Sequence, residues 1–312
     1  MKTTPRLYAT LIALLLATTT PAAAQTKRPR ITGVAHIALY SADIAKTRAY
    51  YRDILGFHEP YSLNNPDGSF SMTFFKVNER QYIEIFPETK PHTDRLAHIS
   101  VETDDIEGMR LYLAEKGIPV PAKVNTGRIK NKSFNVKDPD GHIVEFVQYM
   151  PDGWTVREKG KHLPNGVSAR MMHIGIIVNS LEPAMRFYRD ILGFEEFWRG
   201  ARDPKVLQWV NMRVPDGNDY IEFMLHHPVP EETKRGSAHH ICLEVPNMEK
   251  ALQAIEALPA RKSYTLPLEI RTGINRKRQL NLFDPDGTRT ELMEPNTVDG
   301  KPAPSSTLPP PR

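Results

Sequence analysis

Cysteine is nearly absent from this chain, since Cys242 is the only one among 312 residues. A single cysteine excludes an intramolecular disulfide framework. The sequence also has no long run of lysine and arginine, which argues against a nucleic-acid-binding protein. After residue 24, no apolar stretch approaches the roughly 20 residues that a transmembrane helix needs. What remains is a chain long enough for two ordinary domains, each able to bury its own core.

The first 24 residues have the pattern of a secretory signal peptide. Lys2 and Arg6 precede an apolar run from residue 7 to 17, and small residues follow up to Gln25. We therefore expect an exported protein, periplasmic or secreted, that is free of the membrane after cleavage; a membrane anchor or a buried N-terminal helix is the alternative. Residues 1–24 contain two basic and no acidic residues, so cleavage would lower the net charge from +4 to +2 (39 basic against 37 acidic residues).

An exact repeat divides the remaining chain into two halves. Tyr-Arg-Asp-Ile-Leu-Gly-Phe occurs at residues 51–57 and again at 188–194, each copy fifteen residues after a histidine. Such a repeat indicates a duplicated unit. Each half begins with a short strand-like run, an amphipathic helix and three further strands, and the same order then starts again. The pattern predicts an α+β protein made of four β-α-β-β-β units in two pairs.

The predicted boundaries follow from this repeat. We expect the first domain at residues 31–150, a polar linker at 151–169 and the second domain at 170–296. The Pro-rich residues 297–312 predict a disordered tail. The units within a half could pair with each other or be exchanged between halves, and the long linker favours adjacent pairing.

Two equivalent sets of histidine and glutamate stand on the predicted strands. They are His36, Glu84, His98 and Glu145 in the first half, and His173, Glu222, His240 and Glu291 in the second. Residues two positions after the histidines share their strand face and are all small: Ala38, Ser100, Gly175 and Cys242. This leaves room for a metal and a ligand. Cys242 is interpreted as a space-filling residue and not as a nucleophile, because the first half has no copy of it. Two imidazoles and two carboxylates suit Zn, Ni, Co, Mn or Fe(II). The alternative is that these are core residues whose polar groups are paired within the protein. Because duplication copies residues, the second set is not independent evidence for a metal site.

The order of these motifs resembles the vicinal oxygen chelate superfamily, which includes glyoxalase I, methylmalonyl-CoA epimerase, extradiol dioxygenases and bleomycin- or fosfomycin-resistance proteins. The resemblance is carried by His-Ile at 36–37, 98–99 and 240–241, by the seven-residue repeat, and by two Asp-Pro-Asp-Gly turns, at 138–141 and 284–287, each four residues before a glutamate. It implies that two β-α-β-β-β units form one cup-shaped sheet around a metal, so that this chain would have two cup-shaped domains. In glyoxalase I-like members, the matching His-Glu-His-Glu positions bind the metal, and a glutamate moves protons next to a carbonyl.

Three functions are compatible with these residues. The first is a metal-dependent lyase or isomerase that stabilises an enediolate, with Glu145 or Glu291 as the general base. The second is an extradiol-type Fe(II) dioxygenase that uses His173, His240 and Glu291. Against it, such enzymes have other groups at the position of Glu222. The third is a non-catalytic binding or resistance protein. All three act on a small molecule, and a homodimer is compatible with each.

Four further residues are candidates for substrate contacts. Tyr82 and Tyr220 stand two positions before a glutamate of each set and share its strand face, so they could orient a substrate. Arg128 and Arg276 belong to basic groups before the final turns and could hold an anionic substrate at the mouth of each cup. Alternatively, the two tyrosines are half-buried strand residues without a role in binding, and the two arginines lie on solvated hairpins.

Overall fold

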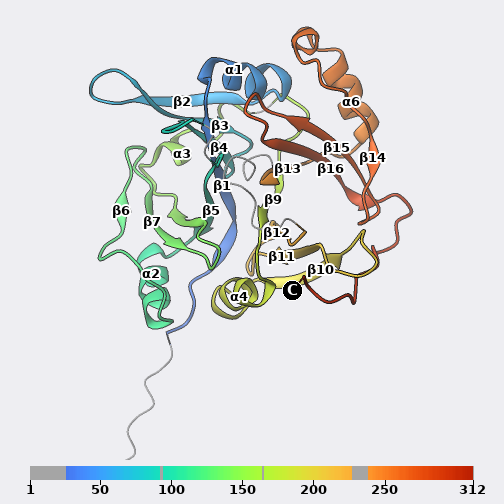
Figure 1. Ribbon diagram of the computed structural model, residues 1–312. Coiled ribbons are helices and arrows are strands. Elements are labelled where there is room, and N and C mark those ends of the chain that lie inside the picture. Colours follow the sequence, from blue (N-terminus) through green and yellow to red (C-terminus); the bar gives the residue numbers. More distant parts are fainter. Residues whose placement is uncertain (1–25, 92–93, 164, 227–237, 312) are drawn as a thin grey trace, which may run out of the picture.

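The protein, described by a computed structural model over residues 26–91, 94–163, 165–226 and 238–311, consists of two eight-stranded sheets (Figure 1). The first half, blue to green in Figure 1, carries one sheet, and the second half, yellow to red, carries the other. The predicted signal peptide lies outside the described residues. No helix in the described ranges is both long and apolar enough to cross a membrane.

The first sheet has the strand order β2-β3-β4-β1-β5-β8-β7-β6. Its strands are β1 (Ile31–Ser41), β2 (His58–Asn64), β3 (Phe70–Lys76), β4 (Tyr82–Pro87), β5 (Leu96–Thr103), β6 (Asn125–Thr126), β7 (Lys132–Lys137) and β8 (Ile143–Gln148). β1 lies at the centre, parallel to β4 and antiparallel to β5, and β5 is parallel to β8. Each β-α-β-β-β unit thus contributes four neighbouring strands to one sheet.

The second sheet repeats this order as β10-β11-β12-β9-β13-β16-β15-β14. Its strands are β9 (Met171–Ile177), β10 (Glu195–Gly200), β11 (Trp209–Arg213), β12 (Tyr220–Met224), β13 (His240–Glu244), β14 (Arg271–Thr272), β15 (Lys277–Phe283) and β16 (Arg289–Thr297). Units of the same half pair in both sheets, because β1 pairs with β5 and β9 with β13. Adjacent pairing is therefore confirmed, and so are the four units in two cups.

The repeated segment forms a helix that changes its winding. In the first half, α1 (Ile44–Ala49) is capped by Asp43, whose carboxylate accepts a hydrogen bond from the amide of Lys46, and it continues as a π-helical turn, η1 (Tyr50–Ile54). The second half repeats this as α4 (Leu181–Met185) and η2 (Arg186–Ile191). The sequence predicted one continuous amphipathic helix here. The π turn inserts an extra residue per turn, which turns both tyrosines of η1 into the core.

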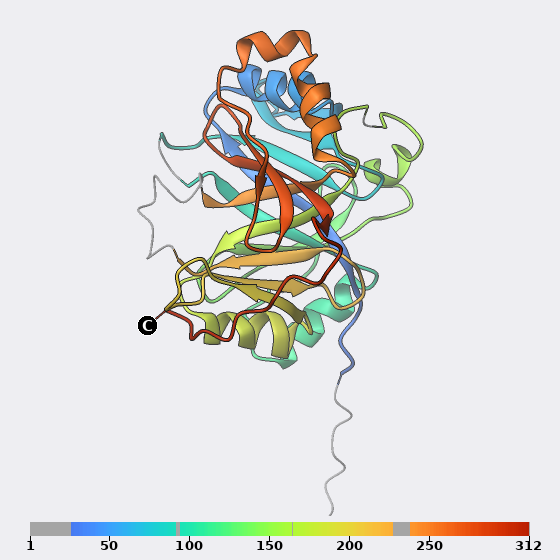
Figure 2. The ribbon, with the colours of Figure 1, turned by 90° about the vertical axis from the view of Figure 1, so that its right-hand side faces the viewer.

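The remaining helices belong to the second unit of each half or lie in the linker. They are α2 (Ile106–Glu115), α3 (Trp154–Arg157), α6 (Met248–Glu256) and the 3₁₀ turn η3 (Pro259–Ser263). The helix pairs of the two halves meet at both ends of the molecule, with α1 beside α6 and α2 beside α4 (Figure 2). At one end the rings of Tyr50 and Tyr264 are 6.2 Å apart, and at the other the Tyr112 hydroxyl donates to the Ile191 carbonyl oxygen at 2.7 Å.

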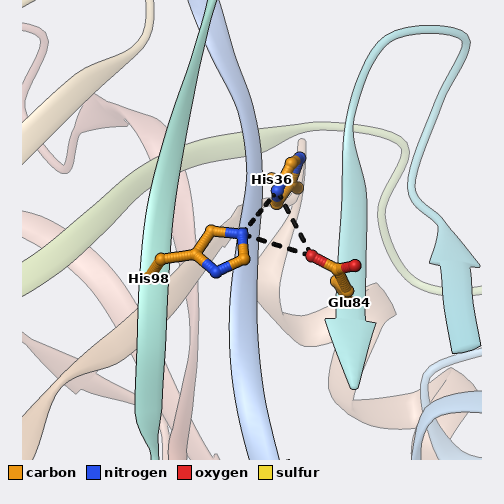
Figure 3. Close-up of side chains that lie close together, drawn as sticks. All are labelled: His36, Glu84 and His98. Atoms are coloured by element: carbon orange, nitrogen blue, oxygen red, sulfur yellow. Dashed lines mark hydrogen bonds and ion pairs between the residues drawn. The ribbon is translucent and has the colours of Figure 1, made fainter. Parts of the chain in front are cut away.

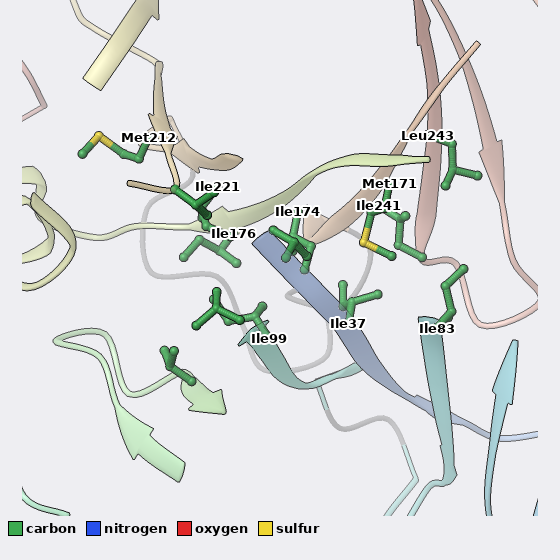
Figure 4. Packing of buried hydrophobic residues seen from close by; sticks show 14 of the residues in the cluster. Ile37, Ile83, Ile99, Met171, Ile174, Ile176, Met212, Ile221, Ile241 and Leu243 are labelled. Carbon is green, nitrogen blue, oxygen red and sulfur yellow. The ribbon is translucent and has the colours of Figure 1, made fainter. Parts of the chain in front are cut away.

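One apolar core joins the two sheets. Because side chains alternate along a strand, the residues that directly follow the histidines point away from the cups, and Ile37 and Ile174 lie back to back between the halves (Figure 4). Both are fully buried. The two halves therefore share one core, and each cup opens on the far side of its sheet.

The seven-residue repeat holds the halves together. The hydroxyl of Tyr51 donates to Asp284 at 3.3 Å, and the hydroxyl of Tyr188 donates to Asp138 at 3.0 Å. Each tyrosine thus reaches the Asp-Pro-Asp-Gly turn of the other half. The repeat and the turn are two parts of one reciprocal contact, which explains why both were kept in both halves.

The linker and the tail are ordered against the sheets. The buried ammonium of Lys76 donates to the carbonyl oxygens of Glu158 and Lys161, both at 2.7 Å, and so anchors the linker. The Pro-rich tail, for which the composition predicts disorder, makes backbone contacts with the second sheet. It runs along β10, where the Ser306 amide donates to the Arg199 carbonyl at 2.9 Å and Trp198 donates to the Pro304 carbonyl at 3.1 Å. An open sheet edge offers unpaired backbone groups to such a segment.

Candidate metal centres

Four side chains converge on the concave face of the first sheet. His36 lies on β1, Glu84 on β4, His98 on β5 and Glu145 on β8, which are the four central strands. Nε2 of His36 lies 2.9 Å from Nε2 of His98, and an Oε atom of Glu84 lies 3.4 and 3.2 Å from these two nitrogens (Figure 3). We call this group and Glu145 the first cup.

The strand register explains this convergence. Ala38 is level with both Glu84 and His98, while Ser100 is level with both His36 and Glu145. The small side chains therefore separate the large ones, as the sequence predicted.

Glu145 stands apart from the three other ligating side chains. Its carboxylate lies 3.4 Å from Nε2 of His36 and accepts a hydrogen bond from Ser100 at 3.2 Å. The three atoms that lie within metal-sharing distance come from His36, Glu84 and His98. Burial raises the pKa of Glu145 to about 7. The geometry thus offers three donors and one separate carboxyl group that changes charge near neutral pH.

A cavity of about 440 Å³ opens onto the first cup. All four of its ionisable residues line the cavity, and Tyr61 and Tyr82 form part of the wall. Burial raises the pKa of both tyrosines, so they stay phenols at neutral pH. Neither hydroxyl has a hydrogen-bond partner of normal geometry among the described residues. Both hydroxyl oxygens are buried.

The second cup contains the equivalent residues in nearly the same geometry. Nε2 of His173 and Nε2 of His240 are 3.0 Å apart, and Glu222 and Glu291 lie 3.5 and 3.6 Å from Nε2 of His240. The Glu291 side chain is 6% exposed, against 16% for Glu145, and both histidines are completely buried. The ring of His240 lies directly over Gly175, where a Cβ would come within 1.9 Å of it.

Apolar side chains close the second cup. Met172, Tyr220, Cys242 and Met293 form a small buried cluster. The ring of Tyr220 lies 4.5 Å from the ring of His173, and its hydroxyl points to the sulfur of Met172 at 3.7 Å. In the first half, Ala35 and Val147 stand where these methionines do. Two cavities of about 370 and 360 Å³ occur in the second half, and neither is lined by the histidines or glutamates of this cup.

The two cups also differ in their electrostatics. Burial lowers the pKa of His240, and the positive charge of Arg289 lowers it further. Burial also acts to lower the pKa of His98, but Glu84 and Glu145 outweigh it, so the pKa of His98 is raised. His98 therefore lies in anionic surroundings, whereas a cation adjoins His240. Burial raises the pKa of Glu222 to about 8.

The predicted substrate residues have different fates. Tyr82 lines the first cavity, while Tyr220 is part of the apolar cluster in the second cup and also lines the second-half cavity of about 370 Å³. Arg128 also lines the first cavity, but its guanidinium donates to the Asn64 carbonyl at 2.8 Å and to Ser71. Arg276 pairs with Asp299 and does not line either of the two second-half cavities described above. The structure thus brings Tyr82 to the site and gives both arginines structural partners.

Two functional side chains escaped the sequence analysis. Tyr61 belongs to β2, which carries no repeat motif that would mark it. Arg289 could have been noticed, because alignment of the two Asp-Pro-Asp-Gly turns places it opposite Ile143.

A divalent metal fits the donor set of the first cup. Three donor atoms, two imidazole nitrogens and one carboxylate oxygen, lie within 4.8 Å of one another on a rigid sheet. Two carboxylates balance the charge of a divalent cation, and the cavity leaves positions open for a substrate.

Comparison with known proteins agrees with this geometry. The model of the glyoxalase/bleomycin resistance protein/dioxygenase superfamily matches residues 33–146 and 170–292, which together make up more than half of the chain. The chain belongs to this superfamily. The predicted family, fold class and two-cup architecture are thereby confirmed.

Individual relatives of this superfamily member span several reactions. It is 24% identical over 268 residues to lactoylglutathione lyase of Schizosaccharomyces pombe, covering 77% of this chain and 82% of the relative. It is 29% identical over 138 residues to human mitochondrial methylmalonyl-CoA epimerase, covering 40% and 73% of the two chains.

Solved structures share the fold at low identity. An extradiol ring-cleaving dioxygenase from B. fuscum superposes with a TM-score of 0.66 at 18% identity, covering 91% of this chain and 77% of that one. The Mn(II)-bound glyoxalase from Novosphingobium aromaticivorans superposes with a TM-score of 0.65 at 16% identity, covering 91% and 89%. A divalent metal is thus bound by a protein of this fold, and this chain has His/Glu groups able to bind one.

Proposed function

We propose that the first cup is a divalent-metal site at which this protein acts as a lyase or isomerase on a small substrate with two adjacent oxygen atoms. One observation carries the proposal. His36, Glu84 and His98 converge at the cavity that Glu145, a carboxyl group with a pKa raised to about 7, also lines.

Each residue has a distinct role in this proposal. His36, Glu84 and His98 would hold the cation, which when bound would polarise the two substrate oxygens and stabilise the charge of an enediolate. Glu145 removes the proton from the carbon next to the carbonyl group and returns it. A general base works best when its pKa lies near the working pH. Ser100 orients this carboxylate through its hydrogen bond.

The cavity wall favours an uncharged substrate. Tyr61 and Tyr82 form part of this wall and stay uncharged at neutral pH. The guanidinium of Arg128 is engaged by Asn64 and Ser71, so the wall offers little to balance an anionic group. A volume of about 440 Å³ lies within the usual range for small-molecule sites.

The dioxygenase hypothesis has one observation in its favour. Two histidines and one carboxylate, as in the first cup, are also the donors of non-haem Fe(II) oxygenases. The iron ligands that the sequence suggested for this reaction, His173, His240 and Glu291, lie in the closed second cup. Any ring cleavage would therefore take place in the first cup.

Hydrogen–deuterium exchange separates these functions. The purified protein is loaded with Mn(II), Co(II), Ni(II) or Zn(II) and mixed in D₂O with α-hydroxyketones, a glutathione hemithioacetal and a methylmalonyl thioester. We expect exchange at the carbon next to the carbonyl, followed by NMR, with at least one substrate and its loss in Glu145→Gln. Oxygen uptake with catechols by the Fe(II)-loaded protein, without any exchange, would favour the dioxygenase instead. Tight binding with neither reaction would favour a binding or resistance protein.

Export is a separate part of the proposal. The charge and apolar pattern of residues 1–24 support it. Mass spectrometry of protein recovered from outside the cytoplasm should find a mature chain that begins near Gln25, and an intact Met1 there would contradict cleavage.

A further inference from the structure

We propose that the second cup does not bind a divalent metal, because Arg289 occupies the outer nitrogen of His240 and supplies the positive charge that a metal would bring. The protein would then bind one metal ion per chain, although it carries two complete His-Glu-His-Glu sets. This assignment concerns metal occupancy, and it stands whether or not the first cup catalyses the proposed reaction.

The register of the strands places Arg289 against the metal-ligating position. On the parallel strands β13 and β16, His240 is directly level with Arg289. On β5 and β8, Ile99 is level with Val144, so that His98 has Ile143 at the equivalent position. Ile143 lines the open cavity of the first cup. Duplication thus left a neutral residue beside one histidine and a guanidinium beside the other.

The contact of Arg289 determines which nitrogen of His240 carries the proton. Nη2 of Arg289 lies 2.7 Å from Nδ1 of His240. A guanidinium only donates hydrogen bonds, so Nδ1 must accept, and the proton of the neutral ring then belongs to Nε2. The Ala238 carbonyl lies 3.3 Å from the same Nδ1, but a proton there would collide with the N–H of Arg289.

This protonation is the opposite of what metal binding needs. Nε2 is the atom of His240 that faces His173, Glu222 and Glu291. A nitrogen that carries a proton has no lone pair for a metal. Metal-ligating histidines normally donate their outer N–H to a carbonyl or carboxylate, which leaves the inner nitrogen free.

The charge of the second cup points the same way. Glu222 and Glu291 bring two carboxylates, as Glu84 and Glu145 do in the first cup, but only the second cup has an arginine in contact with one of its histidines. Nε of Arg289 is buried without a hydrogen-bond partner among the described residues, and its Nη2 contacts Nδ1 of His240. Two sets of three donors lie close together in this cup, His173 with Glu222 and His240, and His173 with Cys242 and Glu291. A divalent cation held by either set would add to a fixed positive charge in a buried site, which is unfavourable.

Exchange of the two residues tests this inference. Metal content is measured by equilibrium dialysis with Mn(II) or Zn(II) and elemental analysis, in the full chain without substrate. We expect one ion per chain in the wild type and close to none in His98→Ala. Adding Arg289→Ile to His98→Ala should restore one ion per chain, with affinity stronger by roughly 10–100-fold than in His98→Ala alone. The reciprocal change Ile143→Arg should remove the ion from the wild-type chain.

Two further variants keep the test decisive. In the His98→Ala background, Arg289→Lys keeps the charge and should leave the second cup empty, whereas Arg289→Met fills the space without charge and should restore binding as isoleucine does. Circular dichroism confirms that each variant is folded. Two ions per wild-type chain, or one ion retained in His98→Ala, would overturn the inference. So would equal binding by the lysine and methionine variants. Loss of the proposed exchange activity with metal content as expected would overturn only the proposed function.

Discussion

The two cups of this protein started as copies and now differ in access, volume and charge. Both keep two histidines and two glutamates with nearly equal separations, 2.9 and 3.0 Å between the paired imidazole nitrogens. The first cup opens into a cavity of about 440 Å³, while Met172, Tyr220, Cys242 and Met293 fill the second. Conservation of a ligand set within one chain therefore says little about whether both copies work.

Three pairs of equivalent residues account for the difference. Met293 stands where Val147 lines the open cavity, Met172 stands where the first half has the smaller Ala35, and Arg289 brings a charge where Ile143 brings none. Each pair lies next to the His/Glu set and not in it. The two cups thus share their histidines and glutamates and differ in the residues around them.

Replacing the histidines that would hold a metal should produce the largest difference in exchange rate between the two cups. We expect His36→Gln or His98→Gln to lower the exchange rate by about 10³-fold, since the loss of a polarising metal forfeits several kcal/mol of transition-state stabilisation. His173→Gln and His240→Gln should change the rate by less than about threefold in folded protein. The measurement is the initial rate of deuterium exchange at saturating metal, and equal losses in both cups would contradict the comparison.

Removal of the base should have the next largest effect. Glu145→Gln should lower the exchange rate by about 10²–10³-fold while substrate binding persists, because general base catalysis contributes an effect of this size. Glu291→Gln is the matched control and should leave the rate unchanged. The rate and the substrate affinity are measured separately, by NMR and by calorimetry, and a slow Glu291→Gln enzyme would place the base in the second cup.

Introducing a methionine of the second cup at the equivalent position of the first cup should close the first cup. Val147→Met places the side chain of Met293 into the open cavity, and we expect the exchange rate to fall by about 10-fold or more, with up to ~1–3 kcal/mol of overpacking cost. Metal content should stay at the wild-type level. The reverse change, Met293→Val, should cost about 1 kcal/mol of stability and leave the rate intact. Denaturant titration and metal analysis check both, and an unaffected Val147→Met enzyme would show that the substrate does not use this space.

The contacts between the halves should differ in their pH dependence. Burial raises the pKa of Asp284 to about 7, above the value of about 3.9 for an unfolded chain. The folded state therefore binds more protons than the unfolded state between these values, so stability falls as the pH rises from about 4 to about 7 and is then level. Asp284→Asn keeps a side-chain oxygen for the amides of Asp286 and Thr288 and cannot ionise.

The asparagine variant should accordingly be more stable than the wild type at pH 8, by ~1–2 kcal/mol, with the difference vanishing near pH 4. Asp138→Asn is the matched variant of the other contact. Asp138 accepts a hydrogen bond from His142 at 2.8 Å as well as from Tyr188, so its replacement should destabilise at both pH values. Melting temperatures at pH 4, 6 and 8 measure this. A stabilised Asp138→Asn protein would show that the two contacts are not distinguished in this way.

Much of the architecture could be predicted because the duplication repeats local signals. The strand-borne histidines, the glutamates and the small residues Ala38 and Ser100 follow a period of two, and the sheets place them as that period requires. Adjacent pairing was favoured only by the length of the linker. Hydrogen bonds between distant strands decided it, and no local pattern shows these.

The difference between the cups was harder to predict. The side chain of Met172 joins the cluster within the cup although it neighbours His173 in the sequence, because a bulge interrupts the pairing of β9 with β13. Simple alternation would point it away. The Arg289 charge matters because this residue lies level with His240 on the neighbouring strand, and the sequence does not show that strand pairing. The ordered tail depends on the exposed edge of β10, which its own composition does not reveal.

Anomalous diffraction from crystals grown with Mn(II) tests the central claim most directly. A difference map recorded near the manganese absorption edge should show one strong peak per chain, bounded by His36, Glu84 and His98. A peak of equal or greater height between His173 and His240 would contradict the functional division of the two cups.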